Sequence, residues 1–413
     1  MRTLLEPTDV TIIGAGPAGT ATAALLQQAG LTVRIVEREH FPRFVIGESL
    51  LPHCMDVLEA AGLLEAVRAR KYQVKNGALF LRGTARCDFS FAEQVTSGWA
   101  WTWQVPRADF DKTLADAVAA RGVPLHYGHT IVSAAFGTDG SVLGVRTPEG
   151  QVVDVRSRFV VDASGYGRVL PRLLGLDRPS VLPERMALFT HVSGDRRPDT
   201  AEANRIWICV HPDGAWLWII PFSTGITSIG AVASPSFFDR YPGDLEAQLR
   251  AIIAGEPSAA TRMAAARFEM PATILRGYSA SVARLHGPGY ALVGNATEFL
   301  DPVFSSGVTL ALESAQRAAA LVVRTLGGEL VDWTREYDDH MRAGVDVFHT
   351  FVTRWYDGTL PDIFFSAAHH PRTRAQICSV LAGYVWDKTN PLVAHHARRV
   401  DQLGRIVRGE LPA

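Results

Sequence analysis

Apolar and polar positions near the start of the chain alternate between two kinds of pattern. Val10 to Ile13 is a short apolar run, and a stretch rich in alanine and leucine continues from it to about Gly30. Leu31 to Glu37 then has the composition of a second strand that ends on an acid. Because a helical pattern between two strand patterns is typical of a βαβ unit, we predict such a unit here.

Strand patterns dominate three regions of the middle of the chain. Residues 75–105 are aromatic and β-branched, residues 123–161 alternate as in a hairpin-rich sheet, and residues 186–285 suit a second, mostly antiparallel sheet. Residues 41–55 read as a loop that enters a helix, and residues 107–120 have an amphipathic helical pattern. We therefore expect two sheets with helices between their segments.

The last part of the chain returns to a strand, loop and helix. Tyr290 to Val293 predicts a strand, Gly294 to Ser306 a loop, and Gly307 to Leu326 a helix. Asp332 to Gly409 is mainly helical in pattern, with breaks near Pro361 and Pro391. This return predicts that the N-terminal domain is completed by residues from late in the sequence.

Composition narrows the class of protein. The chain has 413 residues, of which 47% are hydrophobic, and this length suggests two to three domains. The net charge of -1 shows no excess of positive charge that would favour binding to nucleic acid or to an anionic membrane surface. No apolar run is long enough for a spanning helix and no secretory segment precedes the first strand, so we expect a cytoplasmic protein. The four cysteines are scattered without CxxC spacing, so we expect neither disulfides nor a metal site.

The glycine-rich turn after the first strand has the spacing of a dinucleotide-binding fingerprint. Gly14 permits the tight turn, Gly16 lets the backbone approach a pyrophosphate, and Gly19 allows close packing of helix on strand. Ala18 lies within the same motif, at the positive end of the following helix, where the pyrophosphate would lie. Glu37 follows Gly19 by 18 residues at a strand end and can accept hydrogen bonds from ribose hydroxyls. The fingerprint alone does not choose between NAD and FAD.

Three further segments make that choice through a resemblance. They are Val105 to Asp111 at a helix start, Asp162-Ala163-Ser164-Gly165 after a strand, and Gly294-Asn295-Ala296 after another strand. This ordered set resembles the FAD-dependent monooxygenases of the p-hydroxybenzoate hydroxylase fold over about residues 8–330. The resemblance implies an α/β fold with a glutathione-reductase-like FAD-binding Rossmann domain.

By that resemblance the domains are discontinuous. Residues 8–75, 105–185 and 285–330 would form the FAD-binding domain, and residues 76–104 and 186–284 the inserted antiparallel sheet domain for the substrate. Residues 331–413 would form a helical C-terminal region.

The resemblance also implies contacts to the cofactor. Arg43 and Arg107 would contact the phosphates or the ribityl chain of FAD. Asn295 stands where the family usually has a ribityl-binding aspartate, and an amide can still donate and accept hydrogen bonds. The other cofactor-binding positions implied are Asp162, Asp301, Gly307 and Val308.

Three motifs go beyond the general monooxygenase pattern. Gly47-Glu48-Ser49-Leu50-Leu51-Pro52, Trp216-Leu217-Trp218-Ile219-Ile220-Pro221 and the FxxPxxSxG segment from Phe299 to Gly307 resemble motifs of flavin-dependent halogenases. The resemblance implies FAD used in its reduced form, FADH2, with oxygen and chloride or bromide. Hypohalous acid then passes to an aromatic substrate that is kept away from the flavin.

Family roles follow for these motifs. Trp216 and Trp218 would shield the flavin from nicotinamide and substrate, although two tryptophans on one face of a strand also suit plain core packing. Pro221 and Pro302 would be structural residues of the two motifs. The unsatisfied N–H groups where the loop enters a helix would bind halide at Ser306 and Gly307.

Lys75 is the candidate for the lysine that such halogenases place between flavin and substrate. Lys75-Asn76-Gly77-Ala78-Leu79-Phe80 matches a KxGxxF pattern of phenol and pyrrole halogenases. At the start of an apolar strand the ammonium would be partly buried, which lowers its pKa. Glu48 is its candidate partner, and the alternative lysine, Lys71, lies in a basic run typical of an exposed helix end.

The length of the chain favours the compact halogenases, which act on phenols, pyrroles or carrier-tethered acyl groups. Two aromatic groups could line a substrate pocket but more often such residues pack in a core: Phe89, Phe91, Trp99, Trp101 and Trp103, and Phe348, Phe351, Trp355, Tyr356, Phe364 and Phe365. The resemblance also implies a separate NAD(P)H-dependent flavin reductase as partner, and the substrate could be held on an acyl or peptidyl carrier protein.

Three other functions stay open at this stage. An NAD(P)H-dependent FAD aromatic hydroxylase would share the fold and would need neither halide nor Lys75. An isoprenoid-type flavin reductase also carries a fingerprint and a segment like Gly294-Asn295-Ala296. A flavoprotein without catalytic activity would not need the segment from Phe299 to Gly307.

Overall fold

The N-terminal βαβ unit forms as predicted. The computed structural model describes residues 5–366 and 370–411. Strand β1 (Leu5–Ile13) pairs in parallel with β2 (Val33–Val36), and helix α1 (Pro17–Gln28) connects them. Val10 and Ile12 are fully buried, as expected for a parallel strand that is covered on both faces.

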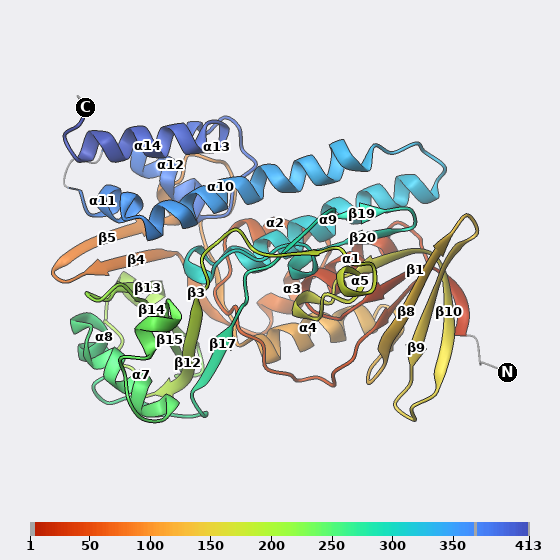
Figure 1. The fold of residues 1–413 in the computed structure, drawn as a ribbon, viewed down its shortest axis with the longest axis horizontal. Helices are drawn as coiled ribbons and strands as arrows, with labels where there is room; N and C mark the ends of the chain where they lie inside the picture. Colours follow the sequence, from red (N-terminus) through yellow and green to blue (C-terminus); the bar gives the residue numbers. More distant parts are fainter. Residues whose placement is uncertain (1–4, 367–369, 412–413) are drawn as a thin grey trace.

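The first sheet is completed by strands from two later parts of the chain. Its order is β19-β20-β10-β1-β2-β7, and a hairpin of β8 and β9 extends it from β10. These strands are β7 (Leu125–His126), β8 (Thr130–Gly137), β9 (Gly140–Arg146), β10 (Val152–Asp162), β19 (His286–Gly287) and β20 (Tyr290–Leu292). Figure 1 shows this sheet at one end of the molecule. Pairing of β20 with β10 confirms that the late strand returns to the first domain.

The second sheet is mostly antiparallel and forms the other end of the molecule. Its order is β16-β12-β15-β14-β13-β4-β5, with β17 paired to β12. These strands are β4 (Gly77–Arg82), β5 (Ala85–Ser90), β12 (Met186–Ser193), β13 (Arg205–Val210), β14 (Trp216–Pro221), β15 (Thr227–Ala233), β16 (Arg267–Phe268) and β17 (Thr273–Arg276). The domain boundaries assigned from the sequence stay predictions.

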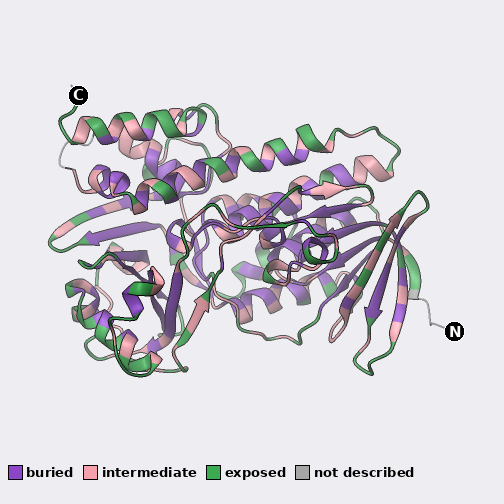
Figure 2. Cartoon of the chain, in the orientation of Figure 1, coloured by how far each residue is buried: buried purple, intermediate pink, exposed green. Residues whose placement is uncertain are grey.

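Helices within residues 235–262 cover the outer face of the second sheet, where the sequence pattern predicted only strands. They are α6 (Pro235–Phe238), α7 (Leu245–Ala254) and α8 (Pro257–Arg262). Asp244 caps α7 by accepting a hydrogen bond from the N–H of Ala247, and Leu249 and Ile252 of α7 are fully buried. With this cover, β14 and β15 are buried along their whole length (Figure 2), which explains their continuous apolar pattern.

The segment from Glu48 to Leu50 runs between the two sheets. It lies against β6 (Thr102–Gln104), because Leu50 N donates to Trp103 O and Val105 N donates to Glu48 O. Strand β3 (Gln73–Lys75) pairs with the other edge of β6, and α4 (Arg107–Ala119) follows directly. We call residues 48–50 the central segment.

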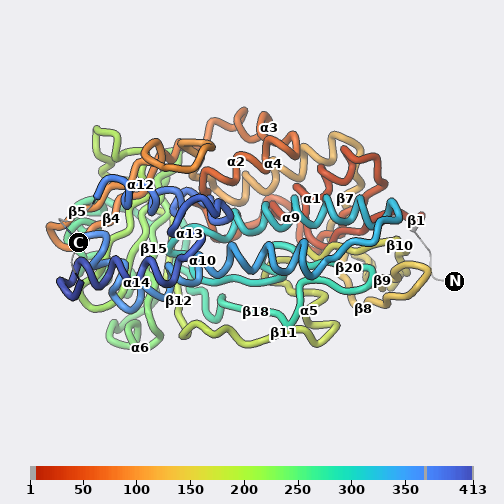
Figure 3. The backbone as a smooth tube through the Cα atoms, turned by 90° about the horizontal axis from the view of Figure 1, so that it is seen from above, coloured from red at the N-terminus to blue at the C-terminus, as the bar shows by residue number. Residues whose placement is uncertain are grey.

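The C-terminal region is helical, as predicted. Helix α9 (Ser306–Leu326) belongs to the first domain, and Figure 3 shows α10 (Asp339–Tyr356) beside it. The remaining helices are α11 (Thr359–Phe365), α12 (Pro371–Leu381), α13 (Pro391–Ala394) and α14 (His396–Val407). The first break lies at Gly358, whose φ is 87°, and Pro361 falls in the first turn of α11, where proline is tolerated.

One carboxylate connects the helical region to the first domain. Glu313 of α9 lies 2.9 Å from Nε2 of His53, at the start of α2 (His53–Ala60), and 2.6 Å from Nε2 of His340 in α10. Burial lowers the pKa of His53, but hydrogen bonds to Asp56 and Glu313 outweigh it and raise that pKa to about 9. Burial raises the pKa of Glu313, but the two histidines outweigh it and lower that pKa to about 2.

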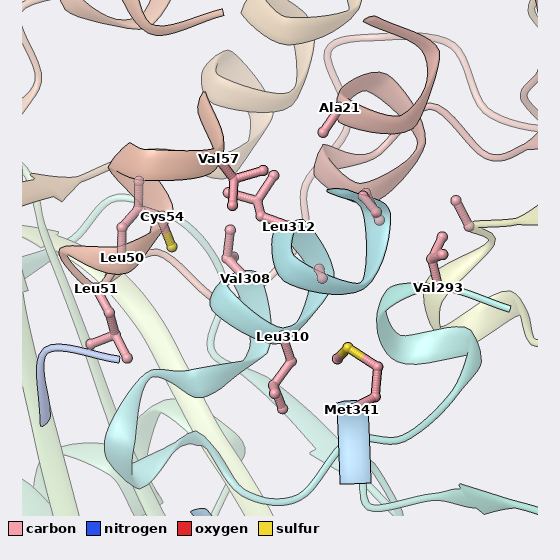
Figure 4. Close-up of a cluster of buried hydrophobic side chains, with 14 of the residues drawn as sticks. Ala21, Leu50, Leu51, Cys54, Val57, Val293, Val308, Leu310, Leu312 and Met341 are labelled. Carbon is pink, nitrogen blue, oxygen red and sulfur yellow. The ribbon is translucent and has the colours of Figure 1, made fainter. Parts of the chain in front are cut away.

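The main core lies where α1, α2 and α9 meet. Figure 4 shows Ala21 of α1, Val57 of α2 and Val308 and Leu312 of α9 in one apolar cluster. The helices approach closely because α1 carries small buried residues. This packing fixes the start of α9 against the glycine-rich turn, and so positions the two halves of the site described next.

Several absences hold for the part of the chain that the structure describes. No helix there is long and apolar enough to cross a membrane. No cluster of histidine, cysteine, aspartate or glutamate there could hold a metal ion. All four cysteines are buried free thiols.

Candidate functional site

A cavity of about 510 Å³ lies between the two sheets. The glycine-rich turn, Glu37 and Arg43 line one part of it, and β14 and the start of α9 line another. The predicted site residues that line it are Gly14, Gly16, Ala18, Glu37, Arg43, Glu48, Arg107, Trp216, Trp218, Asn295, Pro302, Gly307 and Val308. The structure therefore gathers residues from distant segments of the chain around one space.

Packing demands glycine at two positions of the turn. Gly14 has φ +98°, and a Cβ there would lie 2.6 Å from Ala163 O. A Cβ on Gly19 would lie 1.9 Å from Gly14 O. Real Cβ contacts are never so short, so both positions exclude larger residues. Because α1 lies so close to the turn, its N-terminus is open toward the cavity. The N–H groups at a helix N-terminus favour an anionic group there.

Glu37 is fixed at the cavity wall by backbone donors. Its Oε2 accepts from Ala15 N and its Oε1 from Glu39 N, each at 2.8 Å. The side chain is buried but lines the cavity, and each carboxylate oxygen retains lone pairs. This arrangement can accept further hydrogen bonds from hydroxyl groups.

Two arginines share a single carboxylate beside the same cavity. Arg107 lies 2.7 and 3.1 Å from the two carboxylate oxygens of the fully buried Asp111, and Arg43 lies 3.3 Å from it. Arg43 also lies 3.9 Å from Oε2 of Glu37, so the two guanidinium groups on this wall stand beside two carboxylates and keep N–H donors directed at the cavity. Such a wall suits a phosphate-bearing ligand.

Asp162 does not line the cavity, and its carboxylate contacts the backbone after β10 instead. Its carboxylate accepts from Ser164 N at 2.9 Å and Leu170 N at 2.6 Å, and it is not among the lining residues. Burial raises its pKa. It therefore orders the turn after β10, while Asn295 reaches the cavity from the turn after β20.

The turn before α9 brings the predicted halide residues to the cavity. Ser305 has φ 55°, and α9 begins at Ser306. Pro302, Ser305 and Gly307 line the cavity, whereas Ser306 is 2% exposed and does not. Of the two predicted halide residues, only Gly307 reaches the space, so Ser306 could contribute its backbone N–H alone.

Asp301 stabilises this turn without lining the cavity. Its Oδ1 accepts from Val303 N at 2.9 Å, and its Oδ2 accepts from the hydroxyl of Tyr356 at 2.8 Å and that of Tyr278 at 3.4 Å. Burial raises the pKa of Asp301 to about 6. Asp301 does not line the cavity, so its predicted contact with the cofactor could only be indirect.

Trp216 and Trp218 form an indole wall on the second-sheet side of the cavity. Their ring centroids are 6.0 Å apart, and both residues are buried. Trp216 Nε1 donates to the hydroxyl of Tyr356 and Trp218 Nε1 to Oγ of Ser228, each at 3.0 Å. The tryptophans therefore pack in a core and also face the cavity, while Pro221 ends β14 away from it.

Lys75 is buried as the sequence predicted. It is the last residue of β3, is 1% exposed, and donates from Nζ to Leu50 O of the central segment at 2.8 Å. Its ammonium also lies 5.5 Å from the centroid of the Phe91 ring. Burial lowers its pKa to about 7. Lys71, in contrast, is exposed, as expected for the alternative lysine.

Glu48, the candidate partner of Lys75, makes its ion-pair contact with a histidine instead. Glu48 Oε1 lies 2.7 Å from Nε2 of His191 in β12, and no ion pair joins Glu48 to Lys75, both of which are described. Lys75 contacts the central segment at Leu50 O and does not line the cavity, whereas Glu48, within that segment, does. His191 carries no motif in the sequence and lies 143 residues from Glu48, so only the fold reveals this pair.

The aromatic residues considered for a substrate pocket mostly pack in the core. Phe89 lies 5.0 Å from Phe364, ring to ring, and neither residue lines the cavity. Phe348 and Phe351 of α10 are fully buried. Tyr356 differs, since its hydroxyl links Trp216 to Asp301.

Together these residues fit FAD. The glycine-rich turn, the Glu37 carboxylate and the guanidinium donors of Arg43 and Arg107 provide for a diphosphate and a ribose. The indole wall and the start of α9 leave apolar and dipolar surfaces where a flat ring system would lie.

Comparison with known proteins agrees with this fit. Residues 7–263 match the profile of the family described as FAD binding domain. A curated relative, the 1H-pyrrole-2-carbonyl-(peptidyl-carrier protein) chlorinase of Pseudomonas fluorescens, is 27% identical and covers 92% of this chain and 89% of its own.

Two solved structures share the whole architecture. A flavoprotein/dehydrogenase from Cytophaga hutchinsonii is 48% identical with a TM-score of 0.96, over 98% of this chain and 100% of that one. The myxobacterial chondrochloren halogenase, described as a variant of FAD-dependent halogenases, is 26% identical with a TM-score of 0.79, over 99% of this chain and 98% of its own.

Proposed function

The chain belongs to the FAD binding domain family, and from this premise we propose that it is a flavin-dependent halogenase, which halogenates an aromatic substrate with reduced FAD, oxygen and chloride or bromide. When bound and reduced, FAD supplies two electrons to oxygen, and the halide supplies the other two. The residues of this chain bind the cofactor, exclude water and direct the oxidised halide.

The observation that carries this proposal is the buried lysine behind the central segment. A pKa of about 7 leaves a substantial fraction of the Lys75 amine neutral at neutral pH. A neutral amine can accept the oxidised halogen as a chloramine or bromamine, and an ammonium can donate a hydrogen bond to hypohalous acid. A hydroxylase or a simple dehydrogenase has no need for such a residue.

Gly307 and the backbone N–H of Ser306 are the proposed halide contacts. Helix α9 begins there and carries a partial positive charge at its N-terminus. The αL conformation of Ser305 turns the chain so that this helix start reaches the cavity wall. Trp216 and Trp218 would close the same space against nicotinamide, so we propose that a separate flavin reductase supplies reduced FAD.

The substrate proposed is a phenol or a pyrrole, either free or tethered to a carrier protein. The curated Pseudomonas relative is named for a pyrrole on a peptidyl carrier protein, and it matches over most of both chains. Indole-like substrates remain within the same aromatic class.

One assay tests this function. The protein is supplied with FAD, a flavin reductase, NADH, oxygen and bromide or chloride, together with phenols, pyrroles and a pyrrolyl carrier protein, and products are identified by mass spectrometry. Halogenated product that disappears in Lys75→Ala, while oxidation of reduced flavin continues, supports the proposal. Lys71→Ala is the matched control, because Lys71 is exposed.

A second candidate is an FAD-dependent dehydrogenase that uses no halide. It is favoured by the 48% identity to the Cytophaga flavoprotein/dehydrogenase. Rapid oxidation of NADPH by this chain alone, or oxidation of an organic substrate without halide, would establish that function instead.

A further inference from the structure

Halogenation at this site consumes a proton that must reach the FAD cavity. The balanced reaction, on which the proposed function rests, converts reduced FAD, O₂, X⁻, H⁺ and ArH to oxidised FAD, ArX and two H₂O. Oxygen is reduced, and both the flavin and the halide are oxidised. One proton is therefore taken up for every C–H bond replaced by C–X.

Glu48 is placed to deliver that proton. Its side chain is wholly buried yet lines the cavity together with the indole wall. Oε1 contacts His191, but Oε2 is buried without a hydrogen-bond partner. A buried carboxylate oxygen without a donor is costly unless it serves a ligand or carries a proton.

His191 connects this carboxylate to solvent. Its Nε2 lies 2.7 Å from Glu48, and 17% of its side chain is exposed. The ring is held between Phe44 and Phe222, whose ring centroids lie 5.6 and 5.4 Å away, both edge-on. One side of the imidazole is therefore exposed to solvent, and the other side contacts the Glu48 carboxylate.

Other charged groups near this pair are already engaged. Arg107 faces Glu48 from α4, and its guanidinium is paired with Asp111, which also holds Arg43. Tyr166 faces Arg107 from the turn after β10. Among the described residues no other ion pair reaches Glu48, so His191 is its exchange partner.

We propose that His191 and Glu48 form a proton relay from solvent to the FAD cavity. His191 takes a proton from water on one ring nitrogen and passes the Nε2 proton to Oε1 of Glu48. Glu48 then donates its proton to the oxygen that is being reduced to water and returns to the carboxylate. Glu48 acts as the catalytic acid, and His191 positions and recharges it.

The test uses the holoenzyme, reduced with dithionite, in single turnovers with oxygen and bromide across a range of pH. Glu48→Gln is expected to lower the rate of product formation about 100-fold, the range typical of a lost general acid, with FAD affinity within about twofold of wild type. Glu48→Asp should restore part of the rate. His191→Gln should lower the rate about tenfold and displace the pH profile, while the exposed His395→Gln should leave both unchanged.

Two results would overturn the relay. One is a wild-type rate and pH profile in Glu48→Gln and His191→Gln. The other is a loss of rate in Glu48→Gln that equals its loss of FAD affinity, which would show a structural role only. A wild-type protein that forms no halogenated product overturns the proposed function itself, and the relay with it, so the two failures are told apart.

Discussion

The indole nitrogen of Trp216 donates a hydrogen bond to the hydroxyl of Tyr356 over 3.0 Å. Trp216 lies on the wall of the cavity, and Tyr356 is the last residue of α10 in the helical region. The same hydroxyl donates to Asp301, which holds the turn before α9. One phenol therefore connects the indole wall, the turn before α9 and the C-terminal helices.

Tyr356→Phe should loosen this connection without unfolding the protein. Asp301 would lose its shortest donor and Trp216 its acceptor, so the free energy of unfolding should fall by about 1–3 kcal/mol. We expect the halogenation yield per flavin oxidised to fall as well, because both cavity walls lose a restraint. Urea denaturation and product analysis in single turnovers measure the two effects.

Thr353→Ala is the control, since Thr353 lies on an exposed part of α10 and bonds only to the backbone of its own helix. An unchanged stability and yield in Tyr356→Phe would contradict the role given to the hydroxyl.

Lys75→Met should stabilise the protein while removing halogenation. Burial lowers the pKa of Lys75 from 10.5 to about 7, so folding favours the neutral amine. The stability associated with this group is therefore present above pH 10.5 and is lost as pH falls through 7. Methionine avoids burying an ammonium, so the gain should be about 1–3 kcal/mol at pH 6 and should vanish near pH 11.

Unfolding by urea at several pH values measures this effect, with the exposed Lys71→Met as control. A gain that does not depend on pH would mean that apolar packing alone, rather than the buried charge, explains it.

Gly230→Ala should displace the Trp218 indole. A Cβ on Gly230 would lie 2.3 Å from Cζ2 and 2.4 Å from Cη2 of Trp218, and 2.6 Å from Cβ of Phe189. Overpacking of this kind costs about 1–3 kcal/mol. Because Trp218 lines the cavity, we also expect about tenfold weaker FAD binding, measured by quenching of flavin fluorescence.

Gly137→Ala is the matched glycine control, since its nearest neighbour is 3.9 Å away. Wild-type FAD affinity in Gly230→Ala would show that the indole wall does not contact the cofactor.

Glu313→Gln should weaken the attachment of the helical region in a defined pH window. The pKa of Glu313 falls from 4.5 to about 2, so its stabilising effect is present above pH 4.5 and is lost as pH falls through 2. The pKa of His53 rises from 6.5 to about 9, so its effect is complete below pH 6.5 and is lost as pH rises through 9. The substitution should therefore cost most, about 2 kcal/mol, between pH 4.5 and 6.5.

Thermal unfolding of both proteins across pH measures the difference. A cost that is equal at pH 5.5 and pH 10 would contradict an electrostatic origin.

Local patterns in the sequence were enough to predict much of the fold. Hydrophobic periodicity, together with the glycine and proline residues that interrupt it, predicts four parts of the fold. These are the βαβ unit, the helix from residue 107, the strand near residue 290 and the helical C-terminal region. The burial of Lys75 also followed, because an apolar strand begins beside it. In each case the deciding information lies within about ten residues.

Contacts that join distant segments could not be predicted in this way. The pairs of Glu48 with His191 and of Trp216 with Tyr356 depend on how two sheets and a late helix are placed together. The helices covering the second sheet were missed because buried strands and short buried helices share continuous apolar patterns. The contact of Glu48 could not be found from its neighbours in sequence, since His191 lies 143 residues away.

The late return of the chain to the first sheet sets the order of events during synthesis. Gly14 leaves the ribosome early, but Gly294 and Gly307, on the same cavity, follow nearly 300 residues later. The nascent chain must therefore hold an incomplete Rossmann half while the whole second sheet is translated. Cofactor loading therefore waits until both parts of the cavity have been translated, and scarcity of flavin would act only after that point.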